Sequence, residues 1–254
     1  MSTFIRPSGL DAPVWMRGTA RHEAGYIHLE EPRPYSIFDN EPSLVFDFAD
    51  VKDVNGCVAF ASERGLLTHG DPHPGGELRE PVTEWLAQAE KMRRLLQLWH
   101  GVRTAILTSD ITILKNVWDE HLEPAPAATT DDELVMESRW EIEMELNSGL
   151  RNVKTRVAAD WRWEDGAPLN ADGWFSYVTE PQTLLDSLYH QLSMVIVQRI
   201  EARSCLNCGR PFLPADTRQR YCSPTCSSRS RYKRFAEKRQ RESVDAVDAG
   251  DARL

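Results

Sequence analysis

This 254-residue sequence has no long hydrophobic run, and its cysteines are few. No stretch approaches the roughly 18 apolar residues that a transmembrane helix needs, so we expect no membrane association. The first residues, MSTFIRPSGLDAPVWMRG, do not have the basic start and apolar core of a secretory signal. We therefore expect a cytoplasmic protein. In that compartment structural disulfides are rare, and paired cysteines usually serve metal binding or redox chemistry.

Residues 1–202 also lack the sequence patterns of a catalytic site. No motif there pairs a nucleophile with a base, and none is built to cradle phosphate. The acidic residues are scattered, as on the surface of an ordinary acidic protein. We therefore expect that this protein is not an enzyme.

The charges are divided unevenly along the chain, whose net charge is −9. Residues 1–202 hold 18 Lys and Arg against 33 Asp and Glu, whereas residues 203–241 hold 11 against 2. We predict an acidic α+β domain at 1–202 with a sensing or assembly role, a small basic domain at 203–241, and a disordered acidic tail at 242–254. The basic part is expected to meet a polyanion.

The larger domain is predicted to be mainly helical, with some strands. The Pro-rich first 45 residues favour strands or irregular structure. Asp53 is placed to cap a helix, and Gly65 to end it in the left-handed conformation. The clearest helix covers 81–100, where apolar side chains recur every three or four residues and are expected in the core. Its apolar residues are Val82, Trp85, Leu86, Ala89, Met92, Leu96 and Trp99.

The second half of this domain is predicted to hold a hairpin and a further helix. Alternating apolar residues around a Gly- and Asp-containing turn favour a hairpin within 156–178. A helix follows at 180–201, with Thr179 and Gln182 as its capping box, and it leads directly into the cysteine-rich segment. Residues 123–133, rich in Pro, Ala and acidic side chains, are predicted to be an exposed linker.

Four of the five cysteines, Cys205, Cys208, Cys222 and Cys226, lie within 22 residues. Two close pairs can supply four ligands to a tetrahedral zinc ion, because the intervening chain folds a hairpin that brings the pairs together. Gly209 allows a sharp turn that points backbone amides at a thiolate. A redox CxxC pair is the alternative, but it leaves the second pair without a role. Four thiolates close the coordination shell, so we expect one structural Zn²⁺.

The segment after the last cysteine predicts a basic helix. With Cys222 just before this helix and Cys226 in its first turn, the small domain would have the layout of a treble clef. Tyr232 and Phe235 are predicted to pack on the cysteine knuckle. Seven basic residues with a single acidic one favour contact with phosphates, and duplex DNA is preferred over RNA because no base-stacking platform is apparent. The candidate nucleic-acid-binding residues are Arg229, Arg231, Lys233, Arg234, Lys238, Arg239 and Arg241.

The pattern CxxCG…F…RYCSxxCSxRxRxxRxxxKR, within 203–241, resembles the C-terminal zinc finger of bacterial CGNR-type proteins. After Cys226 this sequence reads SSRSR where the family signature has Gly-Asn-Arg, and Arg229 is the residue that can stand in for the signature arginine. Members join a helical N-terminal domain to a four-cysteine finger and a basic helix. The resemblance implies a DNA-binding transcription regulator.

Two hypotheses for the function follow. The first is a zinc-dependent nucleic-acid-binding protein, a bacterial DNA-binding transcription regulator whose N-terminal domain meets an effector or a protein partner. The second is a protein-interaction module, in which the basic finger docks on an acidic protein surface, including that of its own N-terminal domain. Binding to duplex DNA across a salt series separates the two.

Overall fold

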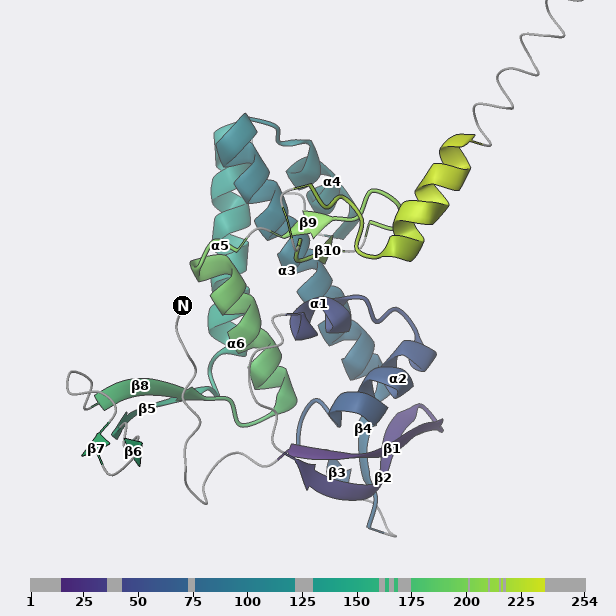
Figure 1. Ribbon diagram of the computed structural model, residues 1–254, viewed down its shortest axis with the longest axis vertical. Helices are drawn as coiled ribbons and strands as arrows, with labels where there is room; N and C mark the ends of the chain where they lie inside the picture. The colour runs from purple at the N-terminus through teal and green to yellow at the C-terminus, as the bar shows by residue number, and fades with distance from the viewer. Residues whose placement is uncertain are drawn as a thin grey trace, which may run out of the picture. The chain divides into compact units, whose positions relative to one another are not determined.

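A computed structural model gives the fold of the chain (Figure 1). The structure describes residues 15–35, 43–72, 76–121, 130–159, 163–164, 167–168, 175–200, 202–209, 211–214, 216 and 218–235. The chain divides into two compact units, Met1–Ile200 and Glu201–Leu254. The larger unit mixes helices with antiparallel strands, as predicted. The tail at 242–254 lies outside the described residues.

A four-stranded antiparallel sheet in the order β1-β2-β4-β3 lies at one end of the larger unit (Figure 1). Its strands are β1 (Trp15–Glu23), β2 (Tyr26–Tyr35), β3 (Asp71–Pro72) and β4 (Leu78–Pro81). Ala24 and Gly25 close the β1–β2 hairpin, and both have the positive φ that a tight two-residue turn requires. Ile27 and Leu29 are fully buried on the face toward the core. The strand prediction for this part of the chain is confirmed.

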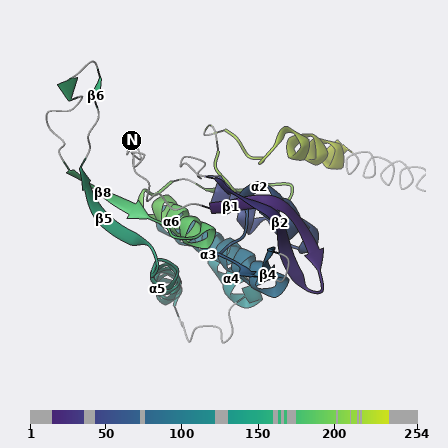
Figure 2. The same ribbon diagram turned by 90° about the horizontal axis from the view of Figure 1, so that it is seen from below.

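The helices of the larger unit gather around α3. They are α1 (Leu44–Ala49), α2 (Val54–Arg64), α3 (Val82–Thr108), α4 (Thr112–His121), α5 (Asp131–Gly149) and α6 (Leu184–Val197). α3 contacts every other helix described in this unit, and it runs beside α5 and α6 (Figure 2). None of the described helices is both long enough and apolar enough to cross a membrane.

The ends of α2 and the buried face of α3 lie largely where they were predicted. Asp53 caps α2 by accepting a hydrogen bond from the Gly56 amide at 2.8 Å. Gly65 ends α2 as predicted, but with φ of +85° and ψ of −169° it lies outside the left-handed helical conformation that was predicted. A Cβ atom there would lie 1.9 Å from the Met16 carbonyl oxygen. α3 is confirmed and extends to Thr108, beyond the predicted end. Most of its predicted stripe is buried, whereas Leu86 and Trp99 are half-buried.

Two predictions about helix starts are wrong. The capping box of α6 is formed by Thr183 and Asp186 rather than by Thr179 and Gln182, because Thr179 belongs to a strand. The acidic end of the predicted linker, 131–133, is the first turn of α5, and Thr130 and Glu133 form its capping box. Residues 123–129 of that linker lie outside the described residues. α4 and α5 were not expected from the sequence.

The predicted hairpin between α5 and α6 is confirmed. β5 (Lys154–Ala159) pairs with β8 (Phe175–Glu180) in antiparallel register, and two short strands, β6 (Trp163–Glu164) and β7 (Ala167–Pro168), pair between them. Thr179 Oγ1 on β8 lies 2.9 Å from His190 Nε2 on α6. This contact links the hairpin to the following helix.

One buried carboxylate organises the junction of the sheet with the helices. Glu80, at the end of β4, accepts hydrogen bonds from the Leu67 amide at 2.9 Å, the Thr68 amide at 2.6 Å and Trp85 Nε1 at 2.8 Å. The side chain is almost fully removed from solvent. It therefore fastens the chain after α2 to the first turn of α3 through charge-assisted hydrogen bonds.

Tyr189 ties three helices together. Its side chain is buried on α6, and its hydroxyl donates to Gln88 Oε1 on α3 at 3.1 Å. Its ring lies against the last residue of α5, Gly149, where a Cβ atom would be 2.1 Å from the ring. Only a residue without a side chain fits at that end of α5 in this packing.

Candidate metal centre

The first cysteine pair lies in a turn between two short strands of the smaller unit. β9 (Arg203–Ser204) and β10 (Pro211–Phe212) pair in antiparallel register. Cys205 and Cys208 lie in the turn that connects them. Gly209 has φ of +72°, and its amide donates to the Cys205 carbonyl oxygen at 2.9 Å. The sharp turn predicted after the first pair is therefore present.

The second pair lies at the start of a helix that covers 224–235. Cys222 precedes the helix and Cys226 is in its first turn, as predicted. Ser223 Oγ accepts a hydrogen bond from the Cys226 amide at 3.2 Å, so Ser223 caps the helix. Pro224 occupies the first helical position, where its missing N–H costs nothing. Ser223 was not predicted to be a cap, although a Ser-Pro pair before a helical segment is a recognisable start signal.

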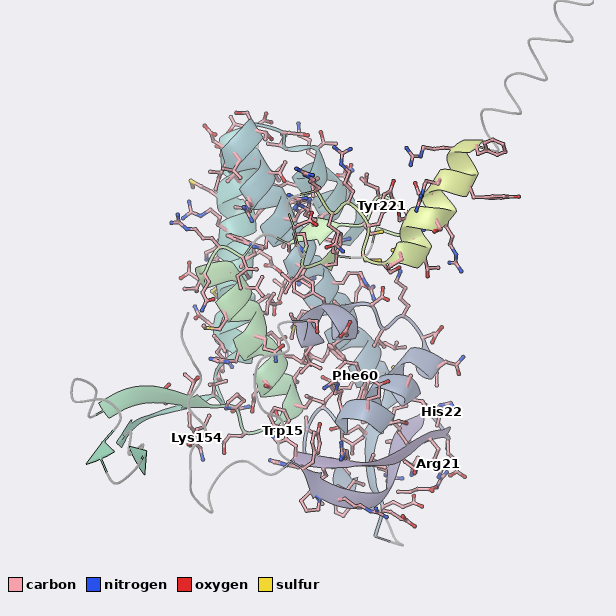
Figure 3. The ribbon with its side chains drawn as sticks, viewed as in Figure 1. Trp15, Arg21, His22, Phe60, Lys154 and Tyr221 are labelled. Carbon is pink, nitrogen blue, oxygen red and sulfur yellow. The ribbon has the colours of Figure 1, made fainter. Side chains whose placement is uncertain are left out.

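A tyrosine fixes the chain that enters this helix. Tyr221 lies in the loop before the helix (Figure 3), and its hydroxyl is 3.0 Å from Ser230 Oγ, about two turns into the helix. The Leu206 amide also donates to the Arg220 carbonyl oxygen at 3.1 Å. These contacts join the loop of the first pair to the approach of the second.

The four sulfur atoms form a compact cluster. Their ligand atoms all lie within 4.8 Å of one another. The Cys208–Cys222, Cys222–Cys226 and Cys226–Cys208 Sγ distances are 3.7, 3.6 and 3.7 Å. A tetrahedron with metal–sulfur bonds of about 2.3 Å has edges of about 3.8 Å, whereas a disulfide would need about 2.05 Å. All four cysteines are free thiols, and their arrangement fits a single metal ion.

The thiols of the cluster differ in acidity. Burial would raise the pKa of Cys205, but amide hydrogen bonds from Cys222, Asn207 and Cys208 lower it to about 6. Burial and the neighbouring thiols raise the pKa of Cys222 to about 12. A hydrogen bond from Ser223, and to a smaller extent one from Cys222, lowers the pKa of Cys226. The cluster therefore favours negative charge at some sulfurs and resists it at others, and a cation that binds all four as thiolates would release protons.

The helix also carries several of the predicted nucleic-acid-binding residues. Four of them are exposed on it, and none forms an ion pair with a carboxylate in the described part of the chain. They are Arg229, Arg231, Lys233 and Arg234. Three others, Lys238, Arg239 and Arg241, lie outside the described residues.

The predicted packing of two aromatic side chains on the cysteine knuckle is wrong. Tyr232 and Phe235 are 76% and 60% exposed. The hydrogen bond of Tyr221 to Ser230 already holds the helix start to the loop, on a side of the helix that these two residues do not share. The helix therefore presents aromatic as well as basic side chains to solvent.

The comparisons with known proteins add nothing to this geometry. The site consists of four clustered thiols, a capped helix and exposed basic side chains on that helix. No protein-family model, no curated protein and no solved structure matches the chain.

Proposed function

We propose that this protein is a zinc-dependent DNA-binding protein, a transcription regulator of bacterial type. One observation carries the proposal: exposed basic side chains stand together on a short helix that begins at the cysteine cluster. Arg229, Arg231, Lys233 and Arg234 have no carboxylate partner among the described residues, although the chain as a whole is acidic. Unpaired basic side chains on one helix are suited to an anionic partner outside the chain.

Zinc is the metal that suits this ligand set best. Thiolates select soft or borderline metals, and two close cysteine pairs in a tetrahedral arrangement are typical of structural zinc sites. Four thiolates fill the coordination shell, so no position is open to water or substrate, and the protein is not expected to be an enzyme on account of this site. The knuckle, the short hairpin and the ligand-bearing helix support a treble-clef arrangement of the smaller unit.

The expected DNA contact is electrostatic. Residues 203–241 carry 11 basic and 2 acidic side chains, and four thiolates with one Zn²⁺ lower the resulting charge by about two. The segment stays strongly basic. Because Cys226 would anchor the helix to the metal, the side chains after it are held together on one rigid element, as phosphate contacts along a duplex require. Duplex DNA remains preferred over RNA.

The regulatory role depends on resemblance and on the composition of the chain. The segment 203–241 resembles the finger of CGNR-type proteins by its motif, with Arg229 in the position of the signature arginine. The acidic unit that precedes it would then act as the sensing or assembly domain. The cytoplasm is the expected location for such a regulator.

A second candidate function is favoured by the exposed Tyr232 and Phe235. Phosphate contact does not need aromatic side chains, whereas protein interfaces are enriched in aromatic and arginine residues. The helix would then dock on an acidic protein surface. Its basic residues would give specificity and its two aromatic residues would supply buried area.

Binding of the metal-loaded, full-length protein to duplex DNA across a salt series tests the first proposal. Each phosphate contact releases about one counterion, so Arg231→Ala should lower the slope of log affinity against log salt by about one. Arg231→Glu with Arg234→Glu should abolish binding while the zinc content stays unchanged, because neither residue is a metal ligand.

The matched control is Lys52→Glu with Arg151→Glu, which makes the same change in net charge at exposed positions of the larger unit. It should leave most of the DNA affinity intact. Wild-type protein without salt-dependent affinity for duplex DNA would show that the first proposal is wrong. In that case, loss of a protein complex by the same helix variant would support the second.

A further inference from the structure

A groove of about 730 Å³ opens between the C-terminal parts of α3, α5 and α6 in the larger unit. Its volume is in the range that holds an organic ligand, roughly 300–1,000 Å³. The groove is lined mainly by apolar side chains. They include Val102, Ile106, Ile142, Leu146, Ile196 and Val197.

Parts of this lining are exposed to water. Ile106 is 65% exposed and Val197 is 75% exposed. Apolar side chains gathered in a concave site mark a place where a ligand can remove surface from water. A ligand of this groove therefore needs, first, an apolar part that covers these side chains.

The same groove carries three arginines, Arg103, Arg139 and Arg199, against one acidic side chain, Glu143. Among the described residues, none of the three arginines forms an ion pair. Nearby Arg94 on α3, in contrast, pairs with Glu141 at 3.0 Å. The groove is therefore locally positive within the acidic unit, and an anionic group is the second requirement.

Two residues that line the groove, Arg103 and Trp99, carry hydrogen-bond donors that lack acceptors. Arg103 Nη1 and Trp99 Nε1 are shielded from solvent and have no hydrogen-bond partner in the described structure. Buried donors are nearly always paired in folded proteins, so each needs an acceptor that the chain does not supply. Because both atoms are donors only, the missing group is an acceptor such as a carboxylate.

We propose that this groove binds an organic carboxylate with an apolar body. The carboxylate accepts hydrogen bonds from Arg103 and Trp99, and Arg139 and Arg199 add positive charge around it. The apolar body lies on the side chains of α3, α5 and α6, with Ile106 in its wall. This inference stands on the larger unit alone and does not depend on the proposed DNA binding.

Calorimetry and thermal unfolding of the metal-loaded, full-length protein test the proposal with defined probes. Octanoate and 2-naphthoate offer a carboxylate on an aliphatic and on an aromatic body. At least one of them should bind and raise the melting temperature of the larger unit, since a ligand that binds only the folded state stabilises it. Acetate, which has no apolar body, and 1-octanol, which has no charge, should each bind at least about tenfold more weakly because each lacks one requirement.

Two variants locate the binding. Arg103→Gln should lower the affinity for octanoate and 2-naphthoate at least about tenfold, to the level of 1-octanol or below. It should leave the affinity for 1-octanol unchanged, because only the charged hydrogen bond is lost. Ile106→Asp should abolish carboxylate binding by placing a like charge in the wall. Since Ile106 is exposed, this variant should fold.

Each variant has a matched control. Met136→Asp introduces the same group at a residue that is also 65% exposed but does not line the groove. Arg33→Gln removes one positive charge from the β1–β2 hairpin. Three results would each overturn the proposal: neither carboxylate binds, 1-octanol binds as tightly as octanoate, or a variant and its control lose the same affinity for the carboxylates.

Discussion

At the scale of single residues, the buried acid Glu80 is expected to stabilise the larger unit. It accepts four hydrogen bonds, from the Leu67 and Thr68 amides, the Thr68 hydroxyl and Trp85 Nε1. Glu80→Ala would leave the Leu67 amide and Trp85 Nε1 without acceptors, and we expect a loss of unfolding free energy on the order of 3 kcal/mol. Urea unfolding followed by circular dichroism measures it.

The control for this prediction is Glu63→Ala. Glu63 is exposed on α2, and its removal should change stability by less than about 0.5 kcal/mol. A Glu80→Ala protein as stable as this control would mean that the donors around Glu80 find water or another acceptor.

The clustering of the four cysteines could be predicted from single residues, whereas the groove could not. Cys205 and Cys226 were predictable because each belongs to a pair whose spacing alone describes a coordination site. Arg103, Arg139 and Arg199 come from different parts of the chain, and nothing in their local sequence separates them from other surface arginines. Only the packing of α3, α5 and α6 brings them to one groove.

At the scale of elements, α3 and α6 should contribute most to stability through their apolar stripes. Trp85 on α3 and Leu188 on α6 are both fully buried. Trp85→Ala and Leu188→Ala should each cost on the order of 2–5 kcal/mol, because the core loses apolar contact and retains part of the cavity. Denaturant unfolding of the larger unit gives the measurement.

Met144→Ala on α5 is the matched truncation outside the core, since Met144 is 50% exposed. It should cost well under 1 kcal/mol. Equal losses at Leu188 and Met144 would show that burial does not set the contribution of these helices.

The helices α2 and α3, whose signals are local, were predicted, whereas α5 was missed although Thr130 and Glu133 give it a local capping box. α2 has its own cap and its own terminating glycine, so its ends are encoded nearby. The start of α6 was misplaced because Thr179 and Thr183 are both followed, three residues later, by an amide or acid. The pairing of β8 with β5 decides between them by taking Thr179 into a strand. The pairing of Tyr26 on β2 with Pro81 on β4 likewise cannot be predicted from the sequence around either residue.

At the scale of the whole molecule, the two units should respond differently to loss of metal. Few apolar side chains are buried among the residues of the smaller unit that the structure describes, so most of its folding free energy is expected to come from metal binding. Purified protein should contain about one zinc per chain. Cys205→Ser, or treatment with a strong chelator, should unfold the smaller unit and leave the larger one folded, as measured by metal analysis and amide hydrogen exchange.

Cys57→Ala is the control for Cys205→Ser, because it removes a cysteine that lies outside the cluster. Cys57 is buried in α2 and does not belong to the cluster, so this variant should keep its zinc. A smaller unit that stays folded and protected after the metal is removed would contradict the prediction.

Because Tyr189 is buried between three helices, its ionisation can report whether these helices are packed together. Burial raises the pKa of the Tyr189 hydroxyl well above its usual value, so the phenol stays protonated while the junction is closed. The folded state therefore loses stability as pH rises above about 10, the ordinary tyrosine pKa, because the unfolded chain gives up this proton more readily. Alkaline opening of the helices should thus appear, without any label, as a late component of the tyrosinate absorbance that Tyr189→Phe lacks.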